Sequence, residues 1–229
     1  MKDFIKKYRH AWLILAYFPI YLLWFFLLEK NVTKDYYIIS SPLDSYIPFV
    51  EWFIIPYLLW FPFIAGFVLY FIFRDKSEYY RLSGLLISGM TVFCLVCTFF
   101  PNGLDLRPDL ETLGRQNIFL DLIHILHKAD TSTNVCPSIH VYNSLAVCLA
   151  VFTSKHLKRA HAVKAGTLIL TAAICMSTVF LKQHSVIDVI CAFALAAVLA
   201  PVFYLRRSPK EADAHKSALS EEDAKNAFN

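Results

Sequence analysis

The sequence is poor in charged residues, which make up 17% of its 229 positions. Soluble globular domains usually carry about 25% charged and about 45–50% apolar residues. Here 57% of the residues are hydrophobic, and the mean hydropathy is +0.50. The few charges stand in short clusters between long apolar runs. This pattern is typical of a polytopic membrane protein, because a spanning helix needs roughly 20 mostly apolar residues.

The sequence also lacks a basic nucleic-acid-binding face, a cleavable signal peptide and a clear disulfide framework. The net charge of +4 comes from short clusters beside apolar runs, so no nucleic-acid partner is expected. No small-residue cleavage site follows the first apolar run, which we therefore interpret as a spanning helix. Five of the six cysteines lie in apolar runs. The spacing of Cys94 and Cys97 suits a redox or metal motif, but small buried residues are the favoured interpretation.

Six apolar segments predict an all-α polytopic membrane protein with six transmembrane helices. They are residues 11–28, 50–73, 82–100, 139–153, 163–181 and 186–205. The fourth segment is short, and its start carries polar residues suited to a cavity. A further short helix is expected near residues 117–128. Residues 1–205 are thus expected to form one membrane domain, and residues 206–229 a charged tail.

The positions of Lys and Arg in short loops predict the orientation of the chain. In the six-span plan all four basic clusters fall on one side, which is therefore cytoplasmic. They are Lys2 with Lys6, Lys7 and Arg9; Arg74 with Lys76 and Arg81; Lys155 with Lys158, Arg159 and Lys164; and Arg206 with Arg207. Both termini are then cytoplasmic, and three polar clusters face the extracytoplasmic side. The lack of eukaryote-type targeting signals favours a bacterial plasma membrane.

His184 and Asp188 form the first candidate pair on that side. Their spacing of four places both side chains on one face of a helix. A carboxylate that binds one ring nitrogen leaves the other free as a nucleophile, which an attack on phosphorus requires. The alternative is a capping or packing pair without chemistry.

The segment from Pro137 to His140 forms the second candidate group. Proline suits a first helical position, which would leave the amides of Ser138, Ile139 and His140 free at a helix N-terminus. Such an end binds phosphate well, and His140 would protonate a leaving oxygen. The alternative is an ordinary helix start with an interfacial histidine.

Arg107 and Lys182 are the candidate cations. The Arg107 guanidinium offers a planar fork that matches phosphate oxygens, and Lys182 offers a compact charge. Interfacial anchoring is the alternative for both. His124 and His127 have no clearly placed third ligand, so we interpret their segment as an amphipathic interfacial helix and expect no metal.

These motifs resemble the type 2 phosphatidic acid phosphatase superfamily, over about residues 101–188. Arg107-Pro108 matches the end of its first motif, Lys-x6-Arg-Pro. Residues 137–140 match its second, Pro-Ser-Gly-His, except at Ile139. Ser177, His184 and Asp188 match the spacing of its third, Ser-Arg-x5-His-x3-Asp. The six-span plan agrees with the integral membrane members of that family.

The resemblance implies a role for each matching residue. His184 would be the nucleophile that forms a phosphohistidine, Asp188 its orienting partner, and His140 the general acid. The phosphate ligands would be Arg107, the Ser138 hydroxyl and the Ile139 amide. Neither a metal nor another cofactor is implied.

The sequence departs from the family pattern at three positions. Phe100 stands in place of the first-motif Lys, and Thr178 in place of the third-motif Arg. Lys182 is a candidate replacement for one of these cations, whereas Asp105 adds a negative charge nearby. With Ile139 in the second motif and Lys-Gln-His in the third, the chain looks similar to a variant branch that includes inositol phosphorylceramide synthases and related bacterial proteins.

Three functions follow from this resemblance. The first is a phosphatase acting at the extracytoplasmic face on a lipid phosphate such as phosphatidic acid, phosphatidylglycerol phosphate or a polyprenyl pyrophosphate. The second is a lipid phosphotransferase or headgroup transferase of the inositol phosphorylceramide synthase type. The third, motivated by the missing cations, is a non-catalytic lipid-binding or transport protein on the same scaffold. The expected partners are the lipid substrate and the bilayer.

Overall fold

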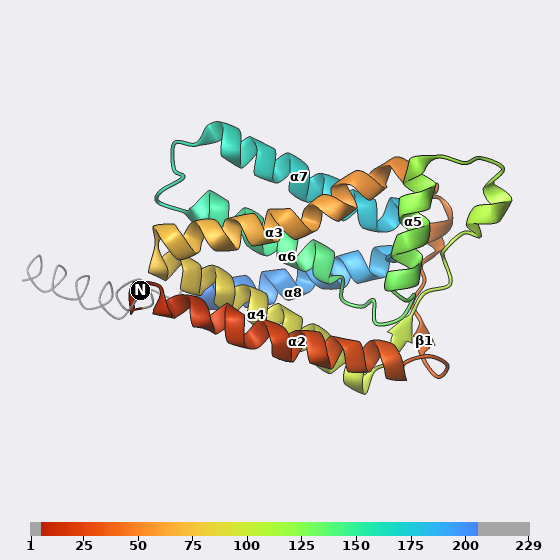
Figure 1. Ribbon diagram of the computed structural model, residues 1–229, viewed down its shortest axis with the longest axis horizontal. Helices are drawn as coiled ribbons and strands as arrows, with labels where there is room; N and C mark the ends of the chain where they lie inside the picture. Colours follow the sequence, from red (N-terminus) through yellow and green to blue (C-terminus); the bar gives the residue numbers. More distant parts are fainter. Residues whose placement is uncertain (1–5, 206–229) are drawn as a thin grey trace, which may run out of the picture.

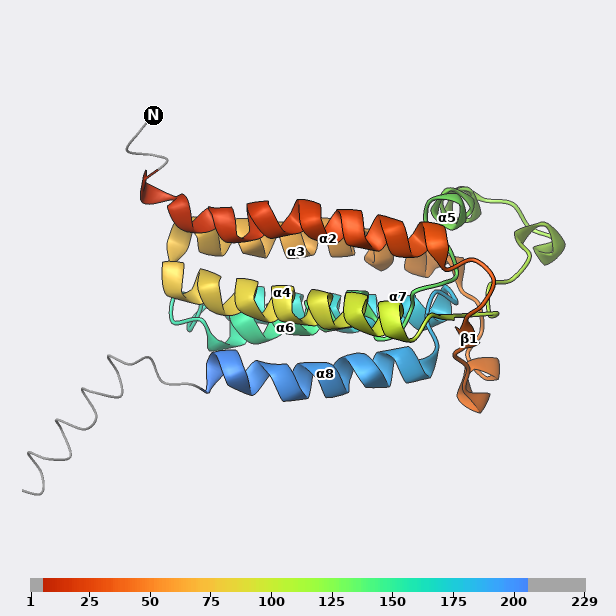
Figure 2. The same cartoon turned by 90° about the horizontal axis from the view of Figure 1, so that it is seen from below.

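The computed structural model describes residues 6–205, and the chain is mostly helical within them. Six α-helices run along a common bundle axis, and a shorter seventh helix, α5, lies across one end (Figures 1 and 2). Their bounds are α2 Trp12–Asn31, α3 Ile54–Arg74, α4 Lys76–Phe99, α5 Ile118–Ala129, α6 Ile139–Thr153, α7 His161–Phe180 and α8 Val186–Tyr204. All six apolar segments and the short helix near 117–128 are thus helical, as predicted. Lys2, Arg206, Arg207 and the tail 206–229 lie outside the described residues.

Five helices, α2, α3, α4, α7 and α8, are long and apolar enough to cross a membrane. The 15-residue α6 is shorter. At 1.5 Å per residue it rises about 22 Å, whereas the hydrocarbon core of a bilayer is about 30 Å thick. This helix nevertheless occupies the centre of the bundle and packs against α3, α4, α7 and α8. The sixth span therefore stays a prediction.

The outer helix α2 shows why the bundle suits a lipid environment. It packs against α4, and most of its surface faces outwards. Large apolar side chains such as Ile20, Leu23 and Phe26 are more than 60% exposed on it. Contact with water would make such a surface costly, since each buried apolar side chain is worth about 1.5–3 kcal/mol. A hydrocarbon environment removes that cost.

Asp75 joins α3 directly to α4. Its extended backbone ends α3, and its Oδ1 accepts hydrogen bonds from the amides of Ser77 (2.8 Å) and Glu78 (3.1 Å). This is N-capping, in which a carboxylate satisfies amides that have no partner inside the helix. One residue therefore makes the whole connection between two long helices.

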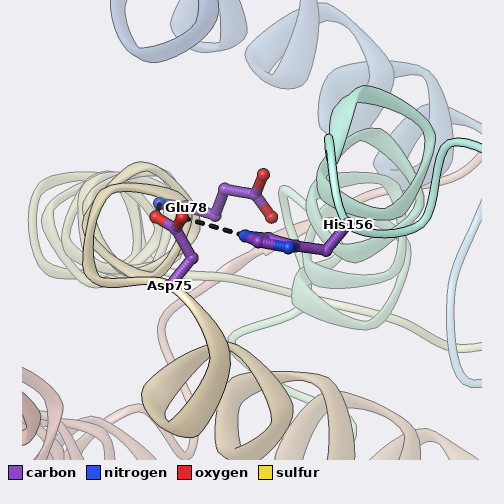
Figure 3. A group of neighbouring side chains, drawn as sticks. All are labelled: Asp75, Glu78 and His156. Carbon is purple, nitrogen blue, oxygen red and sulfur yellow. Dashed lines mark hydrogen bonds and ion pairs between the residues drawn. The ribbon is translucent and has the colours of Figure 1, made fainter.

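Asp75 also belongs to an end cluster that consists of Asp75, Glu78, Lys155 and His156. Figure 3 shows three of these side chains, Asp75, Glu78 and His156. Its Oδ2 contacts Lys155 Nζ (2.7 Å) and His156 Nε2 (3.0 Å). Glu78 accepts the Ser154 hydroxyl (2.6 Å) and the Lys155 amide (2.9 Å). Burial raises the pKa of Asp75, but its interactions with Lys155, His156 and the two capped amides outweigh burial and hold the pKa below its usual value. The cluster fastens the α3–α4 turn to the loop between α6 and α7.

The end cluster also has the composition of a cation site. One ligand atom each from Asp75, Glu78 and His156 lies within 4.8 Å of the others. However, the Lys155 ammonium already supplies a positive charge 2.7 Å from Asp75. We therefore interpret the cluster as an ion-pair network.

At the opposite end, a small parallel sheet fixes the loop that leads into α6. Strand β1 (Tyr37–Ile38) pairs with β2 (Asn102–Gly103), and Gly103 also bridges to Thr133. The Asn102 side chain accepts the amides of Val135 (3.0 Å) and Cys136 (2.9 Å). A Cβ on Gly103 would lie 2.6 Å from the Tyr36 ring, so this close approach requires glycine.

Candidate active site

Four of the seven predicted site residues come from three separate segments and meet at the end of the bundle that α5 covers. They line a cavity of about 30 Å³, roughly the space of one water molecule. Arg107, Ile139, His140 and His184 line it, together with Asp130 and Asn134. Phe25 from α2 and Phe93 from α4 form its apolar wall. The cavity lining thus combines polar side chains with apolar ones from α2 and α4.

His184 and Asp188 lie close together at the start of α8. Nδ1 of His184 is 3.4 Å from Oδ2 of Asp188, which is longer than a usual hydrogen bond. The same oxygen accepts the Ser185 amide at 2.9 Å, so Asp188 also completes a capping box. Asp188 therefore caps α8 and also lies beside the His184 ring, and its catalytic role stays a prediction.

His140 lies in the first turn of α6 and is held by aromatic rings. Its ring centroid is 4.5 Å from that of Tyr57 and 4.4 Å from that of Trp60, both on α3. The His184 ring is 5.7 Å away. The two histidines thus line one cavity, His140 from the start of α6 and His184 from the turn before α8.

The start of α6 differs from the expectation in one detail. Pro137 precedes the helix rather than opening it, and Ser138 is the N-cap, because its extended backbone and side-chain oxygen suit that position. The buried Ser138 hydroxyl accepts a hydrogen bond from the Val141 amide (3.4 Å). The backbone amide of Ser138 donates to the Asp188 carbonyl (3.2 Å). Ser138 therefore joins α6 to α8, while Ile139 and His140 present the first-turn amides, which have no carbonyl to bind within the helix.

The Arg107 guanidinium lines the cavity and is fixed by three hydrogen bonds. Its Nη1 donates to the Asp130 carbonyl (2.7 Å), and its Nη2 donates to the Thr131 carbonyl (2.7 Å) and to Gln183 Oε1 (2.6 Å). Its Nε is buried without a partner among residues 6–205. Burial lowers the pKa of Arg107 from a very high starting value, and arginine stays charged in proteins. Arg107 thus provides a fixed positive charge.

Two acidic side chains stand near this arginine. The Asp130 carboxylate lies 3.9 Å from Arg107 Nη2 and lines the cavity. Burial raises the pKa of Asp130 to about 6, Arg107 opposes that rise, and Glu29 adds to it. Glu29, at the end of α2, accepts hydrogen bonds from Thr131 and Asn134. The candidate phosphate site is therefore less positive than the family motifs imply.

Lys182 lies away from this cavity. Its backbone is left-handed (φ 58°), and its Nζ donates to the carbonyls of Asp44 (2.6 Å) and Ile47 (2.5 Å). Burial lowers the pKa of Lys182, and Asp44 counteracts the shift. The Asp44 carboxylate in turn binds the Ser185 hydroxyl (2.7 Å) and the Val186 amide (2.9 Å). Lys182 and Asp44 thus fasten the turn that carries His184.

The residues that replace the family cations have other contacts. Phe100 stacks on Tyr37 with ring centroids 4.5 Å apart. Thr178 is fully buried, and its carbonyl accepts the amides of Gln183 (2.9 Å) and His184 (3.0 Å). Asp105 is exposed and does not line the cavity. Thr178 therefore shapes the turn before α8.

Sequence reasoning missed four side chains that support the site: Asp44, Tyr57, Trp60 and Asp130. Each lies in a different segment from the motif residue that it contacts, so no local spacing connects them. One signal was present, because Tyr57 and Trp60 are three residues apart and share one face of α3. Two aromatic side chains on one face of α3 could have indicated that a further ring, here that of His140, packs against that face.

Comparison with known proteins gives one match. A family model described as the PAP2 superfamily matches residues 82–211, which is more than half of the chain. The matching region runs from α4 through α8 and contains all the motif residues. No curated protein and no solved structure matches the chain.

Proposed function

The chain belongs to the PAP2 superfamily, and from this premise we propose that it is a membrane lipid phosphate phosphatase with His184 as nucleophile. Membership of this family supports a phosphatase or a related activity on lipid phosphates. The observation that carries the proposal is the meeting of the His140 and His184 rings, 5.7 Å apart, beside Arg107. A nucleophile, an acid and a fixed cation at one cavity suit phosphoryl transfer.

The proposed reaction has two steps. First, Nε2 of His184 attacks phosphorus, a P–N bond forms, and the P–O bond to the lipid alkoxide breaks. His140 gives its proton to that oxygen, because an alkoxide is a poor leaving group. Asp188 stabilises the positive charge on His184 through Nδ1. Second, a water molecule gives a proton to His140 and attacks phosphorus, the P–N bond breaks, and inorganic phosphate leaves.

The phosphate would be held by Arg107 and by the first-turn amides of α6. The positive end of the helix dipole adds to this attraction. Phe25 and Phe93 support access from the membrane side, since they place apolar surface next to the cavity. We propose phosphatidic acid, phosphatidylglycerol phosphate or a polyprenyl pyrophosphate as substrates, handled at the extracytoplasmic face with both termini cytoplasmic.

The first test is release of inorganic phosphate from a panel of lipid phosphates by the purified full chain in detergent. We expect His184→Ala to lower the rate about 1000-fold or more, the scale on which nucleophiles act. His161→Ala is the matched control, because His161 is an exposed histidine at the start of α7. It should stay within about twofold, as surface substitutions usually do.

Two further measurements make this test decisive. Alkaline quenching of a reaction with ³²P-labelled lipid should trap base-stable phosphohistidine on His184. A chelator should leave the rate unchanged. Activity that requires an added divalent metal, or turnover that survives His184→Ala, would contradict the proposed mechanism.

A second candidate function, lipid phosphotransfer, is favoured by the charges around Arg107. Asp130 and Glu29 lie near this cation. A phosphomonoester carries about −1.5 to −2 charges at pH 7, whereas a phosphodiester carries only one. The negative charges of Asp130 and Glu29 repel a monoester more strongly than a diester, so a diester headgroup fits this site better.

The two functions differ in what accepts the phosphoryl group. Incubation of the chain with a labelled phospholipid diester and a lipid alcohol would separate them. Formation of a new labelled diester, with little free phosphate, supports transfer. Free phosphate from monoesters, unaffected by the alcohol, supports hydrolysis.

A further inference from the structure

Gln183 links Arg107 to His127 across the top of the candidate site. Gln183 lies in the turn before α8, Arg107 in the loop after β2, and His127 in the last turn of α5. Arg107 Nη2 donates to Gln183 Oε1 (2.6 Å), and Gln183 Nε2 lies 3.0 Å from His127 Nε2. The Gln183 side chain is only 2% exposed, so both ends of its amide need partners.

The chemistry of arginine fixes the direction of this link. Arginine can only donate hydrogen bonds, so the oxygen of the Gln183 amide must face Arg107. The amide nitrogen then faces His127 and donates to it. His127 Nε2 must therefore be the unprotonated nitrogen, and the ring carries its proton on Nδ1.

The surroundings of His127 agree with a neutral ring. Burial, with smaller contributions from the charges of Arg107 and His124, lowers the pKa of His127 to about 4. Near neutral pH, His127 can accept a hydrogen bond without titrating.

The link determines which N–H groups of Arg107 remain free. The guanidinium has five N–H groups. Three of them are used, by the carbonyls of Asp130 and Thr131 and by Gln183. Two are left, and one of these is the buried Nε–H, which has no partner within residues 6–205.

We propose that Gln183 and His127 are positioning residues, which hold the Arg107 guanidinium so that its free Nε–H faces a substrate phosphate. This proposal rests on the proposed function, because it takes Arg107 as a phosphate ligand. Gln183 Nε2 also donates to the Leu181 carbonyl at 3.3 Å, so loss of the His127 acceptor leaves this longer hydrogen bond to orient the amide. The restraint on Arg107 Nη2 then weakens, and the phosphate should bind less tightly at an unchanged chemical step.

Steady-state kinetics on a lipid phosphate test this role. His127→Leu removes the acceptor, and we expect KM to rise about 5- to 20-fold with kcat within about threefold, as for one charge-assisted hydrogen bond. Gln183→Leu should behave in the same way. His127→Gln restores an acceptor at a similar reach and should return KM to within about threefold of wild type. His124→Leu, an exposed neighbour on α5, is the matched control and should change neither constant.

The tautomer of His127 is a test that does not depend on turnover. Nitrogen-15 NMR of histidine-labelled protein in detergent should show His127 with Nε2 unprotonated at pH 7. Gln183→Leu should change the Nε2 shift. A proton on Nε2, or a shift that does not respond to Gln183→Leu, would overturn the link.

The two proposals fail in different ways. If wild type releases phosphate but both leucine variants keep its KM, the positioning role is wrong and the proposed function stands. If wild type releases no phosphate from any lipid, the proposed function fails. Thermal-shift titration with orthovanadate then decides the positioning role, since weaker binding by His127→Leu supports it and equal or no binding by both proteins overturns it.

Discussion

The two polar groups at opposite ends of the bundle differ in how completely their atoms are paired. In the end cluster, each of the four carboxylate oxygens of Asp75 and Glu78 accepts a hydrogen bond or forms an ion pair. In the candidate site, several buried atoms have no partner among the residues that the structure describes. They are Arg107 Nε, Asn134 Oδ1, His140 Nδ1, His184 Nδ1 and Asp188 Oδ1.

This difference agrees with a structural role for the end cluster and with the catalytic role proposed for the site. A buried polar atom without a partner costs about 1–3 kcal/mol, so folding alone does not explain a concentration of them. The end cluster has histidine and carboxylates too, but its groups satisfy one another. Composition alone would rank the two groups as similar, whereas their hydrogen bonding distinguishes them.

The largest expected effect comes from Asp188→Asn. The amide keeps the size of the side chain and an oxygen for the Ser185 amide, but it removes the charge beside His184. We expect phosphate release to fall about 100- to 10,000-fold, as when a triad carboxylate is neutralised. The thermal unfolding temperature should change little. A variant that unfolds at a much lower temperature would instead assign Asp188 a mainly structural role.

Asp75→Ala should have the opposite profile. It removes the cap of α4, worth about 0.5–2 kcal/mol, and an ion pair whose Lys155 partner is mostly exposed and contributes little. We expect a loss of about 1–2 kcal/mol in unfolding free energy, with turnover within about twofold of wild type. Thermal unfolding and phosphate release measured on the same sample check both halves. A large loss of turnover with unchanged stability would contradict a purely structural role for the end cluster.

Asp130→Asn should change the pH dependence of substrate binding. The pKa of Asp130 is raised to about 6, so its carboxyl is mostly neutral at pH 5 and mostly ionised at pH 8. Ionisation places a negative charge beside Arg107 and repels phosphate. We expect the ratio of KM for wild type to KM for Asp130→Asn to be near 1 at pH 5 and about 3–10 at pH 8. Titration of the substrate itself cancels in this ratio, and a flat ratio would contradict the expectation.

Lys182→Met should have the smallest effect on binding. The Lys182 ammonium is held by the Asp44 and Ile47 carbonyls, away from the cavity. We expect KM to rise less than about threefold, with a loss of roughly 1 kcal/mol in stability from the missing hydrogen bonds. Measurement of KM decides between this account and Lys182 as a replacement phosphate ligand. A rise of tenfold or more would favour the latter.

The helices were largely predictable, and their packing was not. Apolar runs locate helices because a chain in lipid must satisfy its backbone polar groups internally. The same runs do not show which helix is central, since a lipid-facing surface and a buried surface are both apolar. The short α6 lies at the centre and the highly apolar α2 at the edge. The pairing of β1 with β2 also joins segments too far apart for local patterns to indicate.

Within the site, the residues with local spacing were the predictable ones. The interval between His184 and Asp188 gave their proximity, and the second motif placed His140 at a helix start. Ser138 is an N-cap whose hydroxyl accepts an amide of its own helix, and its role as a phosphate ligand stays a prediction. Lys182 was placed near His184 by sequence, yet its left-handed backbone and the Asp44 loop direct its ammonium elsewhere.

Asp44 has a consequence for how such a protein diverges. It fastens the turn that carries the candidate nucleophile, yet it lies outside the region that matches the family. The proposed chemistry and its support therefore lie in different parts of the chain. If the proposed function holds, exchange of the loop around Asp44 should alter catalytic rates without changing a motif residue.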